Sequence, residues 1–163
     1  MTLVSTEWLS NNLSKVKIFD ASWHMPNSNR NSQKEYLDKH IPEAMFWDLD
    51  EHSDKDSPFP HMLPNSDYWT RMLWSFGIEN DDHIIVYDFS DVHSACRLWF
   101  SLKYFGHQKV SVLDGGMKKW LKENRPTSNE TNKDIGKFSY IDKINTKNKY
   151  KVSENFDWIK KKE

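Results

Sequence analysis

The sequence contains few of the residues on which disulfide-bonded, membrane-spanning or exported proteins depend. Cys96 is the only cysteine among 163 residues, which excludes an internal disulfide and a zinc site built from several cysteines. No run approaches the roughly 18 consecutive apolar residues that a membrane helix needs. The N-terminus lacks a basic segment followed by an apolar stretch, so no secretory signal is visible. We therefore expect a cytoplasmic protein without a membrane partner.

Charge is unevenly distributed, although the formal net charge is only −1. Residues 1–117 contain 10 basic and 17 acidic side chains, a net of −7, whereas residues 118–163 contain 13 and 7, a net of +6. A basic tail can bind nucleic acid, but these lysines are mixed with Asp, Glu and Asn, without an aromatic ladder or an arginine cluster. A solvated linker is the expected reading, with no nucleic-acid partner.

The order of apolar patterns predicts one α/β domain with an open, mainly parallel sheet. The clearest strand is 84–87, a continuous β-branched run typical of a buried parallel strand. The other predicted elements are strands at 16–20, 44–47 and 110–113, and helices at 5–14, 32–40, 64–76, 93–105 and 115–121. Because strands and helices alternate, helices should flank both faces of the sheet.

Composition also predicts where this domain ends. We expect the domain to span residues 3–122, followed by a linker over 123–151 that is rich in Lys, Asn and Thr and poor in large apolar residues. After residue 151, a Val-Ser pair followed by a Trp weakly repeats the pattern at the start of the chain. Residues 152–163 are therefore expected to begin a second copy of the same unit.

The connection over residues 48–64 is the best candidate for a functional loop. It has no periodicity and is long for a compact domain, where such loops tend to be functional or disordered. Catalytic groups of open α/β sheets lie at the carboxyl ends of the strands, so this acidic, histidine-bearing loop is a candidate half-site. Its ionisable residues include Asp48, Asp50, Glu51, His52, Asp54, Asp56 and His61. Two other readings stay open. In the first, His61 would cap the following helix and Asp50 would be a solvated loop acid. In the second, His52 and His61 would bind a metal together with the loop acids, although no ligand spacing supports a metal.

Six groups of motifs occur in one order along the chain. They are Val4-Ser5-Thr6-Glu7-Trp8-Leu9; Asp20-Ala21-Ser22-Trp23-His24-Met25-Pro26; Glu35-Tyr36 with His40-Ile41-Pro42; Phe46-Trp47-Asp48-Leu49-Asp50; Ser57-Pro58 with His61-Met62-Leu63-Pro64; and Gly106-His107 with Val110-Ser111-Val112-Leu113-Asp114-Gly115-Gly116 and Trp120. Together they resemble the N-terminal domain of two-domain rhodaneses, the thiosulfate and 3-mercaptopyruvate sulfurtransferases. One departure is Glu43, where the family usually has Gly.

The resemblance implies where a sulfur-carrying cysteine would lie. In this family the cysteine directly follows a central strand, in a loop whose backbone N–H groups and following helix favour the thiolate. The matching position here is Asp88, after strand 84–87, and a carboxylate cannot form a persulfide. The family's first domain characteristically has an acidic residue there. The only thiol, Cys96, is expected inside the next helix, about 120° from its apolar stripe, and is a weak candidate for a sulfur carrier.

The resemblance also gives roles to the loop residues. In mercaptopyruvate sulfurtransferases an Asp and a His of this loop work with a serine of the second domain as a proton relay, and the matching residues are Asp50 and His61. Asp20, Arg30 and Glu35 are expected to support the loops. Arg97 could pair with Asp88, pair with Asp91 or face a partner domain.

We therefore predict the non-catalytic half of a sulfurtransferase. Sulfur would pass from 3-mercaptopyruvate or thiosulfate to a thiol or cyanide through a cysteine of a second rhodanese domain, without a cofactor or metal. The expected partners are that domain and a small-molecule sulfur donor, and this chain alone should be inactive. Asp50 and His61 favour mercaptopyruvate. The alternatives are an inactive rhodanese module that binds a partner protein, and a single-domain sulfurtransferase using Cys96.

Overall fold

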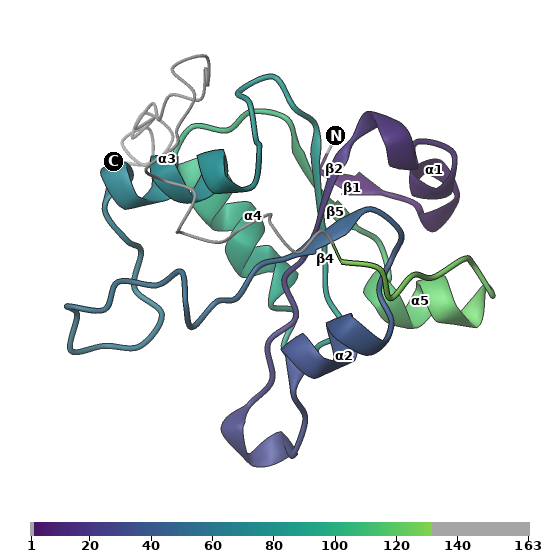
Figure 1. Ribbon diagram of the computed structural model, residues 1–163, viewed down its shortest axis with the longest axis horizontal. Helices are drawn as coiled ribbons and strands as arrows, with labels where there is room; N and C mark the ends of the chain where they lie inside the picture. Colours follow the sequence, from purple (N-terminus) through teal and green to yellow (C-terminus); the bar gives the residue numbers. More distant parts are fainter. Residues whose placement is uncertain (1, 132–163) are drawn as a thin grey trace, which may run out of the picture.

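A computed structural model describes residues 2–131, which form one sheet covered by helices (Figure 1). Five parallel strands lie in the order β1-β5-β4-β2-β3. In chain order they are β1 (Leu3–Val4), β2 (Lys17–Asp20), β3 (Ala44–Phe46), β4 (Ile84–Tyr87) and β5 (Val110–Leu113). The predicted open α/β fold is thereby confirmed.

The sheet is organised around β4, the strand with the strongest apolar pattern. All four residues of β4 are buried, and the strand pairs with β2 on one side and β5 on the other. Its side chains alternate between the two faces, so Ile84 and Val86 join one core while Ile85 and Tyr87 join the other. This two-sided burial explains why the strand has no polar alternation.

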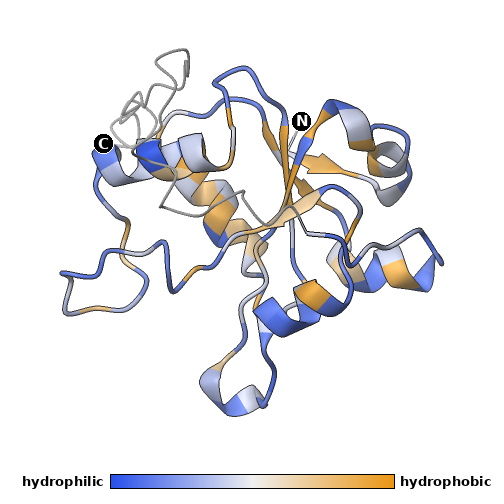
Figure 2. Ribbon diagram, viewed as in Figure 1, coloured by the Kyte–Doolittle hydropathy of each residue, from blue (hydrophilic) through white to orange (hydrophobic). Residues whose placement is uncertain are grey.

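Helices cover both faces of the sheet, with their apolar sides turned inward (Figure 2). One face carries α3 (Ser66–Ser75) and α4 (Ala95–Tyr104), which contribute Trp69, Leu73 and Leu98 to the core. The other face carries α1 (Thr6–Ser10), α2 (Ser32–Asp38) and α5 (Gly116–Lys122). Trp120 of α5 is fully buried there, as the sequence predicts.

The element boundaries differ from the predicted ones by at most two residues, except near the N-terminus. The helix predicted over 5–14 ends at Ser10 and is followed by a short 3-10 helix, Leu13–Lys15. Strand β1 lies outside any predicted strand, because two residues are too few to show a period. A second 3-10 helix, Pro26–Ser28, follows β2.

Glu43 adopts the backbone conformation that the family's usual glycine would favour. Its φ is +67°, in the left-handed region. The Glu side chain therefore strains the turn between Pro42 and β3 without changing the fold, since Ala44 still pairs with Ile18.

The first part of the predicted linker packs against the domain. The Thr6 hydroxyl donates to Glu123 at 2.6 Å, the Trp120 indole donates to the Pro126 carbonyl at 2.7 Å, and Ser128 pairs with His40 through backbone hydrogen bonds. The rest of that linker and the predicted second copy at 152–163 lie outside the described residues. Each helix between residues 2 and 131 is too short or too polar to cross a lipid bilayer.

Candidate functional site

The candidate site lies where three strands end at the same edge of the sheet. Asp20 of β2 is in register with Phe46 of β3 and with Tyr87 of β4, so the chain leaves all three strands on one side. The loops that follow these strands, residues 21–31, 47–65 and 88–94, therefore meet. This edge is where open α/β sheets place their ligands and catalytic groups.

The structure brings Asp50 and His61 together within the long loop after β3. The His61 Nε2 atom lies 2.9 Å from Oδ1 of Asp50, although the residues are 11 positions apart. Asp48 shapes the start of this loop, because its Oδ1 accepts the backbone N–H groups of Asp50 and Glu51. The helix that follows is capped by Asn65, whose side chain accepts from the Tyr68 N–H, so the reading of His61 as its cap is wrong.

The contact with Asp50 determines which nitrogen of His61 is available for chemistry. A neutral imidazole carries one N–H, and the carboxylate at Nε2 favours the proton on that atom. Among residues 2–131 no hydrogen bond is made to Nδ1, which is left as the acceptor for a proton from outside the loop. The pair thus has the arrangement of a general base and its orienting acid.

Trp23 and Arg97 contact the pair from two other elements. The Trp23 indole donates to Oδ2 of Asp50 at 3.0 Å, and its ring meets the His61 ring edge-on at a centroid distance of 5.0 Å. The Arg97 guanidinium donates to the His61 backbone carbonyl. Arg97 forms no ion pair with a described carboxylate, so neither suggested pairing, with Asp88 or with Asp91, occurs in the described part of the chain.

A pocket of about 660 Å³ opens beside these residues. Its walls combine the aromatic, aliphatic and basic side chains of the three loops and of α4; the lining residues are Trp23, Leu49, Pro60, His61, Met62, Leu63, Val92, His93, Ser94, Arg97 and Tyr104. Burial lowers the pKa of Arg97, which still remains a cation because an arginine titrates far above neutral pH. The pocket is large enough for a small anionic molecule and presents a positive charge to it.

Asp88 lies directly after β4, and its carboxylate fills the loop that follows. Oδ2 accepts the Ala95 N–H at 2.7 Å, at the start of α4, and Oδ1 accepts the Ser90 N–H at 3.3 Å. The Asp88 carbonyl accepts the Met117 N–H at 2.9 Å, and a Cβ on Gly116 would lie 2.6 Å from that carbonyl oxygen. Only glycine allows α5 to approach so closely. Burial raises the pKa of Asp88, although the two N–H groups oppose that rise.

Cys96 has the properties of an ordinary thiol. It is exposed in the first turn of α4, and its partial desolvation together with the negative charge of Asp88 raises its pKa. A sulfur nucleophile needs the opposite shift, toward the thiolate. The geometry therefore gives no support to sulfur transfer through Cys96.

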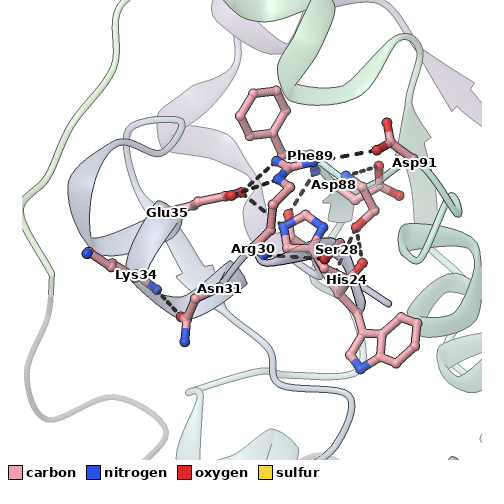
Figure 3. A network of polar contacts seen from close by, with 12 residues as sticks. His24, Ser28, Arg30, Asn31, Lys34, Glu35, Asp88, Phe89 and Asp91 are labelled. Carbon is pink, nitrogen blue, oxygen red and sulfur yellow. Dashed lines mark hydrogen bonds and ion pairs between the residues drawn. The ribbon is translucent and has the colours of Figure 1, made fainter. Parts of the chain in front are cut away.

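A polar network joins the loop after β2 to the loop after β4 (Figure 3). Arg30 binds both carboxylate oxygens of Glu35, at 2.8 and 2.7 Å, and lies 4.9 Å from the ring centre of Phe89. His24 also contacts Glu35 at 3.0 Å. Although burial alone would raise the pKa of Glu35, its hydrogen bonds to Arg30 and His24 lower it. These contacts fit a supporting role for Arg30 and Glu35.

Asp20 occupies a buried position beneath these loops. Its Oδ1 accepts the Ser22 N–H at 3.0 Å and the Ser22 hydroxyl at 2.5 Å, and the Ser22 oxygen in turn accepts the Phe89 N–H. Burial raises the pKa of Asp20. The residue thus links β2 to the 88–94 loop and does not reach the pocket.

His52 belongs to the packing of the loop against α3 and the core. It is 5% exposed, its Nδ1 lies 3.1 Å from the Tyr68 hydroxyl, and its ring packs beside Trp47 and Phe76. Within residues 2–131 no group of three or more His, Cys, Asp and Glu side chains is arranged to hold a metal ion. The metal reading of this loop therefore has no geometric basis.

Sequence reasoning missed Trp23, Ser90 and Ser94 as parts of the site. The Trp23 N–H lies 2.9 Å from the Ser90 hydroxyl and 3.0 Å from that of Ser94, and both serines are buried. An isolated serine in a loop has no periodic signal. The available clue was Trp23 itself, a large aromatic residue directly after a strand at the catalytic edge of the sheet.

Comparisons with known proteins agree with this arrangement. Residues 5–123 match the model of the rhodanese-like domain. The chain is 43% identical to the thiosulfate sulfurtransferase of Bos taurus over 78% of its own length and 46% of that protein. It is 37% identical to the 3-mercaptopyruvate sulfurtransferase of Mus musculus, over 95% of this chain and 56% of that protein.

Solved structures give the same result. The crystal structure of SseA from Escherichia coli, described as a 3-mercaptopyruvate sulfotransferase, superimposes with a TM-score of 0.80 at 32% identity, covering 95% of this chain and 56% of that one. Tum1 of Saccharomyces cerevisiae shares the fold with a TM-score of 0.74 at 23% identity, over 95% of this chain and 50% of that one. The chain thus spans about half the length of the relatives described here.

Proposed function

The chain belongs to the family of rhodanese-like domains, and from this premise we propose that it is the non-catalytic half of a two-domain 3-mercaptopyruvate sulfurtransferase. A second rhodanese domain of the same protein would supply the cysteine. The Asp50–His61 pair would complete the active site from this side. The observation that carries the proposal is the 2.9 Å contact between Asp50 and His61, at the sheet edge where the family does its chemistry.

Three features of this chain favour the role of a non-catalytic domain that completes an active site. The position after β4 is filled by the Asp88 carboxylate, which has no sulfur to give, and Cys96 has a raised pKa. Exposed apolar side chains lie around the pocket, including Met62 and Val92, which are 47% and 46% exposed. Apolar surface of this kind is suited to burial against another domain. The chain also spans about half the length of its relatives.

The chemistry of the donor explains why a proton relay belongs at this site. A cysteine thiolate of the second domain attacks the sulfur of 3-mercaptopyruvate, and a persulfide forms as the carbon–sulfur bond breaks. The electron pair of that bond passes to the pyruvate enolate, which must gain a proton to become pyruvate. His61, oriented by Asp50, would manage this proton through a serine of the second domain. The persulfide sulfur then passes to an acceptor thiol or to cyanide.

Two variants test the relay in the protein that carries both domains. With His61→Gln or Asp50→Asn we expect kcat/KM for 3-mercaptopyruvate to fall about 100-fold, the lower range for general acid–base catalysis. The rate with thiosulfate should change far less, because its leaving group, sulfite, is a stable anion that needs no proton. Equal effects on both donors, or no effect on either, would contradict the proposed role of the pair.

The chain by itself provides a second test. We expect residues 1–163 to transfer no sulfur from either donor to cyanide, and Cys96→Ser to leave the two-domain protein fully active. Transfer by the isolated chain that Cys96→Ser abolishes would overturn the proposal in favour of a single-domain sulfurtransferase.

A further inference from the structure

We propose that Trp23 is a positioning residue for the Asp50–His61 pair, and that the loop over residues 88–94 holds Trp23 in place. The inference rests on the function proposed above and assigns a task to a loop that has no thiol. Two buried serines, Ser90 and Ser94, accept the backbone N–H of Trp23, and the Trp23 indole N–H donates to Asp50.

The backbone of Trp23 is fixed by the 88–94 loop. Its N–H is shared between the hydroxyl oxygens of Ser90 at 2.9 Å and Ser94 at 3.0 Å. The Ser90 hydroxyl donates back to the Trp23 carbonyl at 2.6 Å, and the Ser94 hydroxyl donates to the Ala21 carbonyl at 2.7 Å. Both serines are buried, where each hydrogen bond is costly to break. The position of the Trp23 backbone is therefore fixed by a loop about 70 residues further along the chain.

The indole of Trp23 then fixes the carboxylate of Asp50. A carboxylate that is held only by His61 can rotate and offer either oxygen. Because the indole N–H donates to Oδ2 at 3.0 Å, Oδ1 is the oxygen that meets His61 Nε2. The indole also packs edge-on against the imidazole at 5.0 Å and 80°. One side chain thus sets the orientation of both members of the pair.

Arg97 holds the backbone of His61. Its guanidinium donates to the His61 carbonyl, at a residue whose φ of +58° lies in the left-handed region. A side chain with a Cβ is disfavoured in this conformation, so an external contact such as the one from Arg97 helps to keep His61 there. Trp23 and Arg97 together leave His61 little freedom to turn away from Asp50.

Packing alone does not account for Trp23. The tryptophans at the centre of the core, Trp47 and Trp69, are buried with indole N–H groups that have no hydrogen-bond partner, so they act as apolar bulk. Trp99 of α4 is half-buried and its N–H is also unpartnered. Trp23 is half-buried as well, yet its indole N–H donates a hydrogen bond to the Asp50 carboxylate. Phenylalanine could fill the same space without making that bond.

The test compares two Trp→Phe variants of the two-domain protein. Trp23→Phe should lower kcat with 3-mercaptopyruvate about tenfold, since a hydrogen bond to a charged group is lost. KM should change less than kcat, because the phenyl ring keeps an aromatic side chain in the pocket wall. Trp99→Phe removes an indole N–H without a partner and should leave kcat within about twofold. A double variant, Trp23→Phe with Asp50→Asn, should be no slower than Asp50→Asn alone, because both changes act through one carboxylate.

Two more variants test the role of the loop. Ser90→Ala with Ser94→Ala should lower kcat in the same way as Trp23→Phe, whereas Ser75→Ala, on α3, should not. If Trp23→Phe reduces folding, 3-benzothienylalanine at position 23 removes only the N–H and should give the same loss of kcat. If Asp50→Asn lowers kcat but Trp23→Phe behaves like Trp99→Phe, this inference is wrong and the proposed function stands. If Asp50→Asn has no effect, the proposed function fails first.

Discussion

Protonation of His52 should release the loop that carries Asp50 and His61. Burial lowers the pKa of His52 to about 4, with a smaller contribution from the nearby charge of Lys55. A histidine in the unfolded chain titrates near pH 6.5. At pH 5, therefore, position 52 is protonated in the unfolded chain and neutral in the folded chain. Stability contributed by the neutral imidazole is therefore complete above about pH 6.5 and is lost as the pH falls toward 4.

The size of this loss follows from the two pKa values. The full gap is worth about 3.4 kcal/mol, at about 1.36 kcal/mol for each pKa unit, and about 2 kcal/mol of it should already be lost between pH 7.5 and pH 5.0. For a domain of this size that is a large share of the total stability. The 48–64 loop should respond first, since His52 anchors it to Tyr68 and Phe76.

Urea unfolding of two proteins across pH isolates this contribution. The free energy of unfolding is measured for the natural chain and for His52→Asn, whose amide imitates the Nδ1 side of the ring. Their difference should shrink by about 2 kcal/mol from pH 7.5 to pH 5.0. Tyr68→Phe, which removes the hydrogen-bond partner but keeps the imidazole, should retain the pH dependence. A difference that stays constant over this range would refute the assignment of a buried, neutral His52.

Three further changes test other parts of the structure. Glu43→Gly should raise the free energy of unfolding by about 1 kcal/mol, because glycine accepts the φ of +67° without strain; a loss of stability in urea unfolding would contradict this. Asp88→Ala should lower thermal stability by about 1 kcal/mol through loss of the contact with the Ala95 N–H, whereas Asp88→Asn, which keeps an oxygen acceptor, should lose less. Alkylation of Cys96 by iodoacetamide at pH 7.5 should be slower than that of free cysteine, since its pKa is raised, and Asp88→Asn should accelerate it.

The order and class of the elements could be predicted because the strands have clear apolar patterns. Strand 84–87 was predicted to the residue, since a strand that is buried on both faces has an unbroken β-branched run. Strand β1 was missed because Leu3–Val4 is too short to show any pattern and depends on the register that β5 provides. Helix α1 ended early for a similar reason, because the cap contacts that stop it at Asn11 are local and aperiodic.

The candidate site could be predicted only as separate residues. Asp50 and His61 were identified from their loop and from the family resemblance, and their contact is now seen at 2.9 Å. Their catalytic role stays a prediction. The residues that orient them come from β2's loop and from α4, and Trp23 and Arg97 are 27 and 36 positions away from their partners. Contacts at that distance depend on the fold and leave no local spacing to read.

The Asp88 carboxylate has a consequence for competition between anions. The carboxylate accepts the Ala95 N–H and lies only seven positions before it in the chain. Its effective concentration at this N–H is therefore fixed by the geometry of the loop. A free anion would have to displace a ligand that cannot diffuse away. The occupancy of this loop by a carboxylate should therefore not vary with the concentration of free anions.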